Sequence, residues 1–414
     1  NINGGQAAPA QRPVVKKPKS NLMKLHWEKM EKVPESSVWA NVNQVETNTS
    51  KDNNIAKLKR LFAKNVPKSK ASANGKAKNA GGKKRRRSSI DGKRTQNIEI
   101  GLAQFKQFDT FDSVVAAVCQ MSTDKLSISK VSTLVDICPT PLETKAVTNM
   151  LRQTKRDNNP SKLSKAEQWV IACNKSNKFS MKCKTFLYVL QFNDALNQIS
   201  NRISTISNAC RSITGSKSLK SVLANVLSIG NTMNQGTHAG DARGFKLDSL
   251  LKLTQTKSHD KKMTVLDFLV ESEAEETSKS KDINNLAGLW VTELRGLSDA
   301  ARLRRNEMQK EFNQLKSGMD SVKRIADASP VGDELVGDFL ELSFSSACND
   351  FVSRHASKIQ TLKSLLDEMI SLCDSVALYF GENPKSYDVS KAFSILHTFS
   401  KTYESSLKKY KERV

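Results

Sequence analysis

The chain has 414 residues, enough for two or three compact domains or one elongated helical assembly, and its 18 Gly and 10 Pro are few for a fold of many short strands. This composition favours an all-α fold. Seven scattered cysteines lack the close pairing of disulfide or metal frameworks, no run of 18 apolar residues occurs, and no signal peptide opens the sequence. We therefore expect a cytoplasmic protein that is neither secreted nor membrane-spanning.

The formal net charge of +24 is concentrated in one segment, because residues 64–94 hold twelve Lys or Arg against one Asp, a net of +11. Such basicity predicts an acidic polymer as partner. Nucleic acid, an anionic membrane, microtubules and actin all fit that description, and the charge alone does not choose among them. A solvated loop without a partner is the plain structural alternative.

The N-terminal residues are rich in Pro, Gly and Ala and show no periodicity. We expect residues 1–20 to form an extended, disordered tail that belongs to a preceding part of a longer chain. Residues 64–89 contain almost no apolar side chains, so they cannot bury enough surface to offset chain entropy and are predicted to be disordered. This basic insert separates a short N-terminal piece from the main body.

Two helix starts are marked by capping residues. Thr140, Pro141 and Glu143 place a hydroxyl cap, a proline at the first helical position and a carboxylate at the third. Ser164 and Glu167 repeat the device before an apolar stretch. Helices are therefore predicted to begin at both places.

Two longer stretches carry apolar residues in alternating steps of three and four, which is typical of helices with a narrow apolar seam. Such a seam suits two or three helices packed side by side and predicts a rod-like element. The seam residues are Leu196, Ile199, Ile203, Ile206, Cys210 and Ile213 in the first stretch, and Ile359, Leu362, Leu366, Met369, Cys373, Val376 and Phe380 in the second.

Candidates for catalysis or metal binding are few. The five histidines have no metal-ligand spacing to Cys, Asp or Glu, and phosphate loops, dinucleotide fingerprints and nucleophile elbows are absent from the sequence. The acidic residues Glu271, Glu273, Glu275 and Glu276 are predicted to be solvated. We therefore predict a protein that is not an enzyme and uses no metal or cofactor.

The basic run at residues 83–87 would neutralise phosphates, yet the stretch 63–104 contains no aromatic residue on which a base could stack. The run predicts at most salt-sensitive, nonspecific attraction to nucleic acid. Ser88 and Ser89 follow it directly, a context that suits a basic-directed kinase, and phosphate there would cancel part of the charge.

A glycine-rich segment follows an apolar helix in the middle of the chain. It begins Gly230-Asn231-Thr232-Met233-Asn234-Gln235-Gly236 and continues through residues 240–258. The glycines permit positive φ angles, and the Asn amides are expected to tie down loop carbonyls. Taken alone, the pattern predicts a rigid loop that ends a helix.

This segment resembles the formin homology 2 (FH2) family, whose pattern is G-N-x-M-N-x-G, then G-x-A-x-G-F-x-L-x-x-L-x-K-L-x-x-T-K-S. Every fixed position is present. Leu25-His26-Trp27, residues 37–40 (SVWA), residues 96–100 (QNIEI) and Pro139-Thr140-Pro141 match further family segments in the correct order. The resemblance covers residues of about 21–400.

The resemblance implies an elongated all-α domain that forms a head-to-tail ring dimer, in which each lasso encircles the other subunit's post. Residues 1–20 would end a proline-rich, FH1-like tail, 21–48 form the lasso, and 49–95 the linker with its basic disordered insert 64–89. Residues 96–180 would form the knob, 181–215 a coiled-coil arm, 216–285 the post and 286–414 the C-terminal helices of the coiled coil. The insert departs from the usual family pattern and adds slack of about 25–30 Å by random-coil scaling, which predicts a looser dimer.

The resemblance also implies site residues. Ile100 in the knob would enter the apolar cleft at the barbed end of an actin filament, and Lys257 in the post would pair with actin carboxylates. Leu25, Trp27 and Trp39 would anchor the lasso, since their short segment has no local core to receive the rings. The wall of the partner's post would be formed by Gly230, Asn231, Met233, Asn234, Gly236, Gly244, Phe245 and Leu247.

The implied function is actin nucleation followed by processive barbed-end capping and elongation by a dimer. Profilin–actin would be recruited by a proline-rich segment upstream. Two alternatives stay open: a charge-driven cytoskeletal crosslinker that binds actin sides, microtubules or anionic surfaces through the basic insert, and a nucleic-acid binder. Deleting 64–89 should spare the ring-based activity and abolish a charge-driven one.

Overall fold

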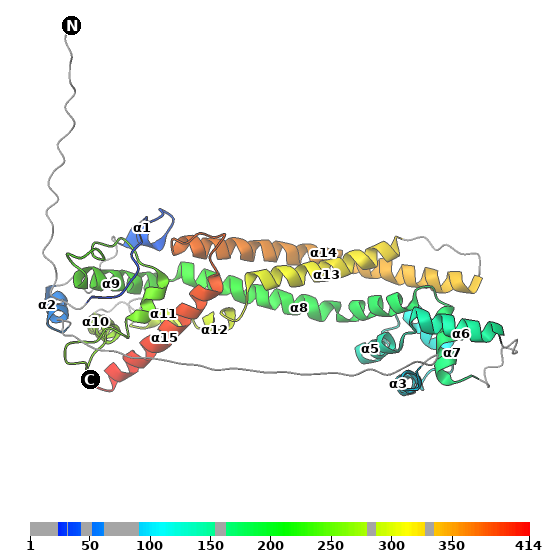
Figure 1. The fold of residues 1–414 in the computed structure, drawn as a ribbon. Helices are drawn as coiled ribbons and strands as arrows, with labels where there is room; N and C mark the ends of the chain where they lie inside the picture. Colours follow the sequence, from blue (N-terminus) through cyan, green and yellow to red (C-terminus); the bar gives the residue numbers. More distant parts are fainter. Residues whose placement is uncertain are drawn as a thin grey trace, which may run out of the picture. The chain divides into compact units, whose positions relative to one another are not determined.

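The computed structural model describes residues 24–30, 32–42, 52–61, 91–153, 163–279, 287–327 and 335–414. The predicted tail 1–20, the insert 64–89 and Ser88 and Ser89 lie outside this part. The described residues form helices, with two isolated antiparallel bridges and no strand, so the all-α prediction is confirmed (Figure 1). None of these helices combines the length and apolar character needed to cross a bilayer.

The chain divides into two compact units. The first unit contains residues of 1–72, 202–305 and 367–414, and the second contains residues of 73–201 and 306–366. Helices α8 (Phe179–Gly215) and α14 (Leu335–Tyr379) each contribute residues to both units.

The second unit contains a cluster of short helices: α3 (Gly92–Leu102), the 3₁₀ helix η2 (Ala103–Phe105), α4 (Phe111–Cys119), α5 (Ile128–Ile137), α6 (Pro141–Gln153) and α7 (Lys165–Asn174). Both predicted helix starts are confirmed. Ser164 and Glu167 form a reciprocal capping box, and Thr140 and Glu143 exchange the same pair of backbone bonds. The buried Trp169 joins the cluster by donating its indole N–H to the carbonyl of Ile137 at 3.0 Å.

The predicted long helices are α8 and α14, and most of their seam residues are buried. Within the second unit, α8 packs against α13 (Arg305–Ala326), where Tyr188 donates to the carbonyl of Leu315 at 2.7 Å. A Cβ at Gly318 would lie 2.2 Å from the Tyr188 ring, so the glycine allows the close approach. In the first unit the seam residues Cys210 of α8 and Cys373 of α14 face each other, so the two predicted seams meet there.

The first unit is built on α9 (Lys217–Met233), the 3₁₀ helix η4 (Leu247–Lys252) and α10 (Val265–Lys279), together with α1 (Val38–Val42) and α2 (Asp52–Leu61). The short helices α11 (Leu289–Glu293) and α12 (Leu297–Ala300) also belong to it. The last helix, α15 (Val389–Lys411), packs on α10, α12 and η4. The resemblance placed all of 286–414 in the coiled coil. In the structure α15 packs on α10 and η4, which lie in the predicted post, and on α12, which lies outside it.

The acidic residues 271–276 on α10 were predicted to be solvated, and this prediction is wrong for the run as a whole. Glu273 is buried and accepts hydrogen bonds from Asn225 of α9 at 3.0 Å and from the hydroxyl of Tyr403 on α15. Burial raises the pKa of Glu273, although both hydrogen bonds oppose the shift. Lys57 of α2 pairs with Glu271 and Glu275 at 3.1 and 3.2 Å. The run therefore joins α10 to three other helices.

Replacing Tyr403 with phenylalanine is expected to lower the free energy of unfolding by about 1–3 kcal/mol at neutral pH, because a buried carboxyl loses a donor. A raised pKa means that the neutral carboxyl contributes stability below its unfolded pKa, and that this contribution is lost as pH rises through the folded pKa. The loss in Tyr403→Phe should therefore shrink at acidic pH. Urea unfolding at two pH values measures both effects. Tyr410→Phe, at a half-buried position on the same helix, is the control, and an equal loss there would contradict the prediction.

Candidate functional site

The N-terminal arm, described over residues 24–30 and 32–42, lies along the glycine segment 230–247 within the first unit. Its backbone forms an antiparallel bridge between Lys29 and Phe245. The N–H of Met30 donates to the carbonyl of Gly244 at 3.2 Å, and that of Lys246 donates to the carbonyl of Glu28 at 3.0 Å. These bonds fix the register of the arm on the segment.

Trp27 packs directly on the backbone of α9 at Gly230. A Cβ at Gly230 would lie 2.2 Å from the indole ring, so no larger residue fits without displacing it. The ring stacks on Phe245 with centroids 5.5 Å apart, and its Nε1 donates to the carbonyl of Ala239 at 3.0 Å. Trp27 therefore has an apolar floor, an aromatic wall and a polar partner for its single donor.

Trp39, on α1, covers a second glycine of the segment, Gly244. A Cβ at Gly244 would lie 2.7 Å from the Trp39 ring, whose side chain is 1% exposed. Its ring centroid is 4.5 Å from that of Phe245, so this phenylalanine contacts both tryptophans. The buried indole Nε1 of Trp39 has no hydrogen-bond partner in the described structure. Packing, with no hydrogen bond to the indole, holds this anchor.

The two asparagines of the motif have different roles. Asn231 ties down the loop as predicted, because its amide donates to the carbonyl of Ala242 at 2.9 Å and accepts from that residue's N–H at 2.7 Å. Asn234 instead binds the arm. Its amide accepts from the N–H of Leu25 at 3.0 Å and donates to the Leu25 carbonyl at 3.1 Å. The fully buried Asn234 thus satisfies both backbone hydrogen-bonding groups of Leu25, as a neighbouring β-strand would.

The glycines also differ from the prediction that they permit positive φ angles. Of the glycines in the segment, only Gly236 has a positive φ, at 73°; the other residue with a positive φ is Asp241, at 51°. Gly230 and Gly244 serve as contact surfaces for indole rings. Met233 and Leu247 are buried beside them. Leu25, Trp27 and Trp39 of the arm therefore contact Gly230, Asn234, Gly244 and Phe245 of the same chain. Their roles in a dimer stay a prediction.

Several contacts of the arm were not identified from the sequence. Met30 packs on Gly381, which has a φ of 72° and follows α14; a Cβ there would lie 2.3 Å from the Met30 methyl group. The Lys29 ammonium donates to the carbonyl of Gly240 at 3.0 Å, and the N–H of Glu28 donates to the Ser249 hydroxyl at 3.3 Å. A glycine directly after a helix is a C-cap signal, so the sequence could have predicted that α14 ends before Gly381. Its contact with the arm depends on tertiary packing.

The sequence model of the Formin Homology 2 Domain matches residues 13–404. The chain belongs to the Formin Homology 2 family. It is 27% identical to Formin-like protein 20 of Arabidopsis thaliana and 28% identical to Formin-like protein 12 of Oryza sativa subsp. japonica, in each case over 94% of this chain. Formin-like protein 17 of Arabidopsis thaliana is 27% identical over 98% of this chain and 80% of its own length. The chain spans 23% and 22% of the first two relatives.

In this FH2 domain, Ile100 lies on the outer face of α3. Its side chain is 61% exposed, whereas Ile98, two residues earlier, is completely buried. The helix is held in place by Gly101, whose missing Cβ would meet Ile137 at 2.7 Å, and by Arg94, which pairs with Glu143 at 3.0 Å. The fold therefore presents an apolar side chain to solvent from a well-anchored helix.

Lys257 of the FH2 domain lies in the first unit and is exposed. Its backbone forms an antiparallel bridge with Thr264, the residue that caps α10 through Asp267. The neighbouring Lys261 and Lys262 are exposed as well, so Lys257 belongs to a local cluster of positive charge. The described residues contain no group of three potential metal ligands.

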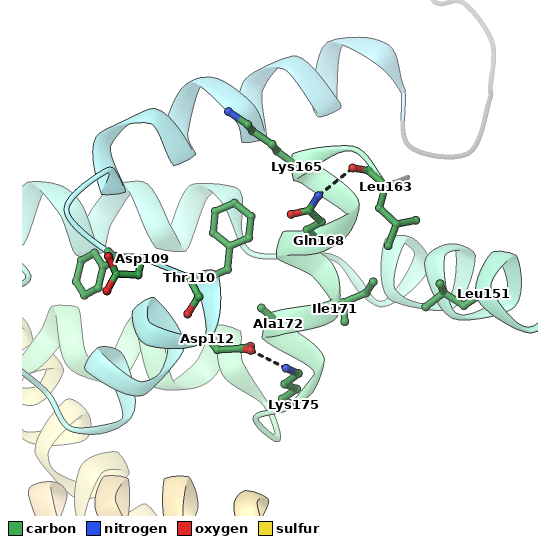
Figure 2. Close-up of a pocket in the computed structure, with 12 residues that line it drawn as sticks. Asp109, Thr110, Asp112, Leu151, Leu163, Lys165, Gln168, Ile171, Ala172 and Lys175 are labelled. Atoms are coloured by element: carbon green, nitrogen blue, oxygen red, sulfur yellow. Dashed lines mark hydrogen bonds and ion pairs between the residues drawn. The ribbon is translucent and has the colours of Figure 1, made fainter. Parts of the chain in front are cut away.

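A cavity of about 750 Å³ opens in the second unit between the start of α4 and α7 (Figure 2). Phe108, Phe111, Leu163 and Ile171 give it an apolar lining, and Lys175 pairs with Asp112 at its rim at 2.6 Å. Ile100 does not line it. Residues 154–162, which lie between the lining residues Leu151 and Leu163 in the sequence, are outside the described part.

Replacing Asn234 with aspartate is expected to weaken docking of the arm by about 2–4 kcal/mol, because a buried amide donor is lost and a charge is buried without a partner. Hydrogen exchange at the amide of Leu25 measures the effect, since that N–H donates to Asn234. Asn208→Asp, at an exposed position on α8, is the matched control. Unchanged exchange at Leu25 in Asn234→Asp would contradict the role of this amide.

Proposed function

We propose that this FH2 domain assembles actin: as a dimer it nucleates filaments and then stays on the growing barbed end while subunits add. Family membership and the construction of the arm interface support the proposal. The main support for the proposal is the fit of Trp27 and Trp39 onto Gly230 and Gly244. These glycines belong to the family motif, so the motif provides a binding surface for the arm. This function requires binding energy only and no catalytic group.

The arm acts as a lasso in the proposed dimer. The structure contains a single chain, and the arm contacts the glycine segment of that same chain. In the dimer each arm makes the same contacts on the other copy, and two such contacts related by a two-fold axis close a ring. Residues 43–90, which include α2, connect the arm to α3, and the proposed ring keeps both docked surfaces as they are. Exchange of an identical element needs no new interface.

Two exposed residues are proposed to contact actin. Ile100 inserts into an apolar cleft at the barbed end, which is consistent with the 61% exposure of this large apolar side chain. Lys257 pairs with actin carboxylates, and the positive charge around it favours an acidic partner surface. Alternate release of the two halves of the ring then allows the dimer to step as each subunit adds.

The relatives are longer than this chain, so the activity of the whole protein is also a proposal. We infer that a proline-rich segment preceding these residues supplies profilin–actin, and that the protein works on the actin cytoskeleton in the cytoplasm. The FH2 domain would receive those subunits at the barbed end. Profilin-dependent elongation by a longer chain, and its absence from residues 1–414 alone, would test this division of labour.

Pyrene-actin assembly with the purified chain tests the proposed function, with light scattering to establish the mass of the species. The wild type should be a dimer that accelerates assembly or caps barbed ends. A variant lacking 64–89 should keep that activity if the ring is responsible. Loss of activity in the deletion variant while it remains a dimer, with steep salt dependence in the wild type, would favour the charge-driven crosslinker. Unchanged actin kinetics with the wild type would overturn the proposal.

Lys257→Asp is expected to weaken barbed-end binding about tenfold, equivalent to about 1.4 kcal/mol, through charge reversal at an exposed contact. Lys217→Asp, on the exposed first turn of α9, makes the same change in net charge and is the matched control. Barbed-end elongation assays at two salt concentrations compare the variants. An equal effect of both substitutions would indicate that net charge, and not the Lys257 contact, governs binding.

A further inference from the structure

Two cysteines face each other in the first unit, one on α8 and one on α14. The sulfur atoms of Cys210 and Cys373 lie 4.0 Å apart, and both side chains are buried. Both thiols are free. A disulfide has an S–S length of about 2.05 Å, so the sulfurs must approach by about 2 Å, a distance within reach of side-chain rotation and a small helix shift.

An ion pair beside the thiols joins the two helices. Arg211, next to Cys210 on α8, donates to Glu368 on α14 at 2.5 Å. Arg305 of α13 donates to Asp374, next to Cys373, at 2.6 Å, so this second pair ties α14 to α13. By contrast, the buried Cys119 contacts a serine hydroxyl, at 3.6 Å.

The two thiols are chemically unequal. A hydrogen bond from the thiol of Cys210 lowers the pKa of Cys373, although burial opposes this, and the nearby Arg305 acts in the same direction as the hydrogen bond. The pKa of Cys210 is raised by the same hydrogen bond and by burial. Because the thiolate is the nucleophile, the lowered pKa favours Cys373 as the thiol that reacts first with an oxidant.

We propose that Cys210 and Cys373 are a redox modification site, at which a peroxide converts the thiol pair into a disulfide that joins α8 to α14. The Cys373 thiolate attacks one peroxide oxygen, which breaks the O–O bond, forms a sulfenic acid and releases hydroxide. The Cys210 sulfur then attacks the sulfenic sulfur, its proton leaves with the departing hydroxyl group, and water is released. Two electrons pass from the thiols to the peroxide, and a thiol reductant reverses the change.

The buried pair limits access to small oxidants. Hydrogen peroxide is small enough to reach the sulfurs during brief local opening of the helix pair. A glutathione molecule is far larger and would need a wider opening. The new bond links positions that are distant in sequence, so it constrains the unfolded chain strongly and should raise the thermal unfolding midpoint by about 5 °C or more. The helices would be joined with their register unchanged.

Peptide mapping under non-reducing conditions after treatment with hydrogen peroxide tests the proposal. We expect a linked peptide pair containing Cys210 and Cys373, a higher unfolding midpoint in the wild type, and reversal of both by dithiothreitol. Cys210→Ala and Cys373→Ala should each lose the linked pair and the shift in midpoint. Cys348→Ala, which removes a different buried thiol, should keep both.

Two outcomes would overturn the proposal. One is peroxide-treated folded protein in which Cys210 and Cys373 remain thiols while the urea-unfolded chain oxidises readily. The other is oxidation of Cys373 to sulfinic acid without a link to Cys210, since a thiol placed to resolve the sulfenic acid should prevent it. Both are read directly from peptide masses, even if an alanine variant proves unstable.

Discussion

Replacing Gly230 with alanine is expected to release the N-terminal arm from the glycine segment while leaving α9 intact. The added Cβ would lie 2.2 to 2.8 Å from three atoms of the Trp27 ring, a clash that requires the indole to leave its site. We expect docking of the arm to weaken by about 3 kcal/mol or more, over a hundredfold in the docking equilibrium. Alanine itself favours a helix interior over glycine by up to about 1 kcal/mol, so the helix should gain stability as the arm is lost.

These opposite effects make the measurement specific. Hydrogen exchange should rise at the arm amides, including Met30, and stay the same or fall in α9. In the proposed dimer the same substitution should shift the mass measured by light scattering toward the monomer. Gly296→Ala, at a position where a Cβ meets no atom within 4 Å, is the matched control. A docked arm in Gly230→Ala would show that the contact tolerates a side chain and is not the basis of the joint.

Replacing Ile100 with aspartate is expected to abolish actin assembly without changing the fold. Because the side chain is 61% exposed, the substitution should alter the free energy of unfolding by less than about 0.5 kcal/mol. If Ile100 is a central anchor in the actin contact, the loss in binding should be about 2–4 kcal/mol, or about thirtyfold to a thousandfold. Pyrene-actin assembly and urea unfolding of the same preparation measure the two quantities.

Two neighbouring positions separate contact from stability. Ile98→Ala, at a fully buried position, should destabilise the second unit by about 2–5 kcal/mol. Leu142→Ala removes another exposed apolar side chain, 78% exposed, from the same unit and should leave both stability and assembly unchanged. Equal loss of activity in Leu142→Ala and Ile100→Asp would mean that general surface hydrophobicity drives the interaction.

The capping residues and the long seams were read correctly from sequence because their causes are local. A hydroxyl at a helix start satisfies N–H groups two or three residues away, as Ser164 does. A step of three or four residues brings apolar side chains to one helix face whatever packs against it, as in α8 and α14. The family motif located the candidate site for a different reason, since the whole set of residues is specific to one family.

Misjudged features involved contacts between residues distant in sequence. Glu273 sits in an acidic run that suggests a solvated surface, yet Tyr403, 130 residues later, supplies its donor. The family resemblance placed helix α15 in the coiled coil, but α15 packs on α10, α12 and η4. Periodicity reveals that a face is apolar and does not reveal which surface covers it.

The sequence by itself determined the all-α class, the family and the helices marked by caps and apolar seams; the roles of the candidate site residues stay predictions. Only the tertiary structure decided which contacts those residues make. Gly230 and Gly244 have no side chain, which lets indole rings contact the backbone, and Asn234 binds the backbone of Leu25. The physical reason is range. Caps and periodic seams act within a few residues, whereas the fit of a ring on a glycine depends on segments about 200 residues apart being brought into contact by folding.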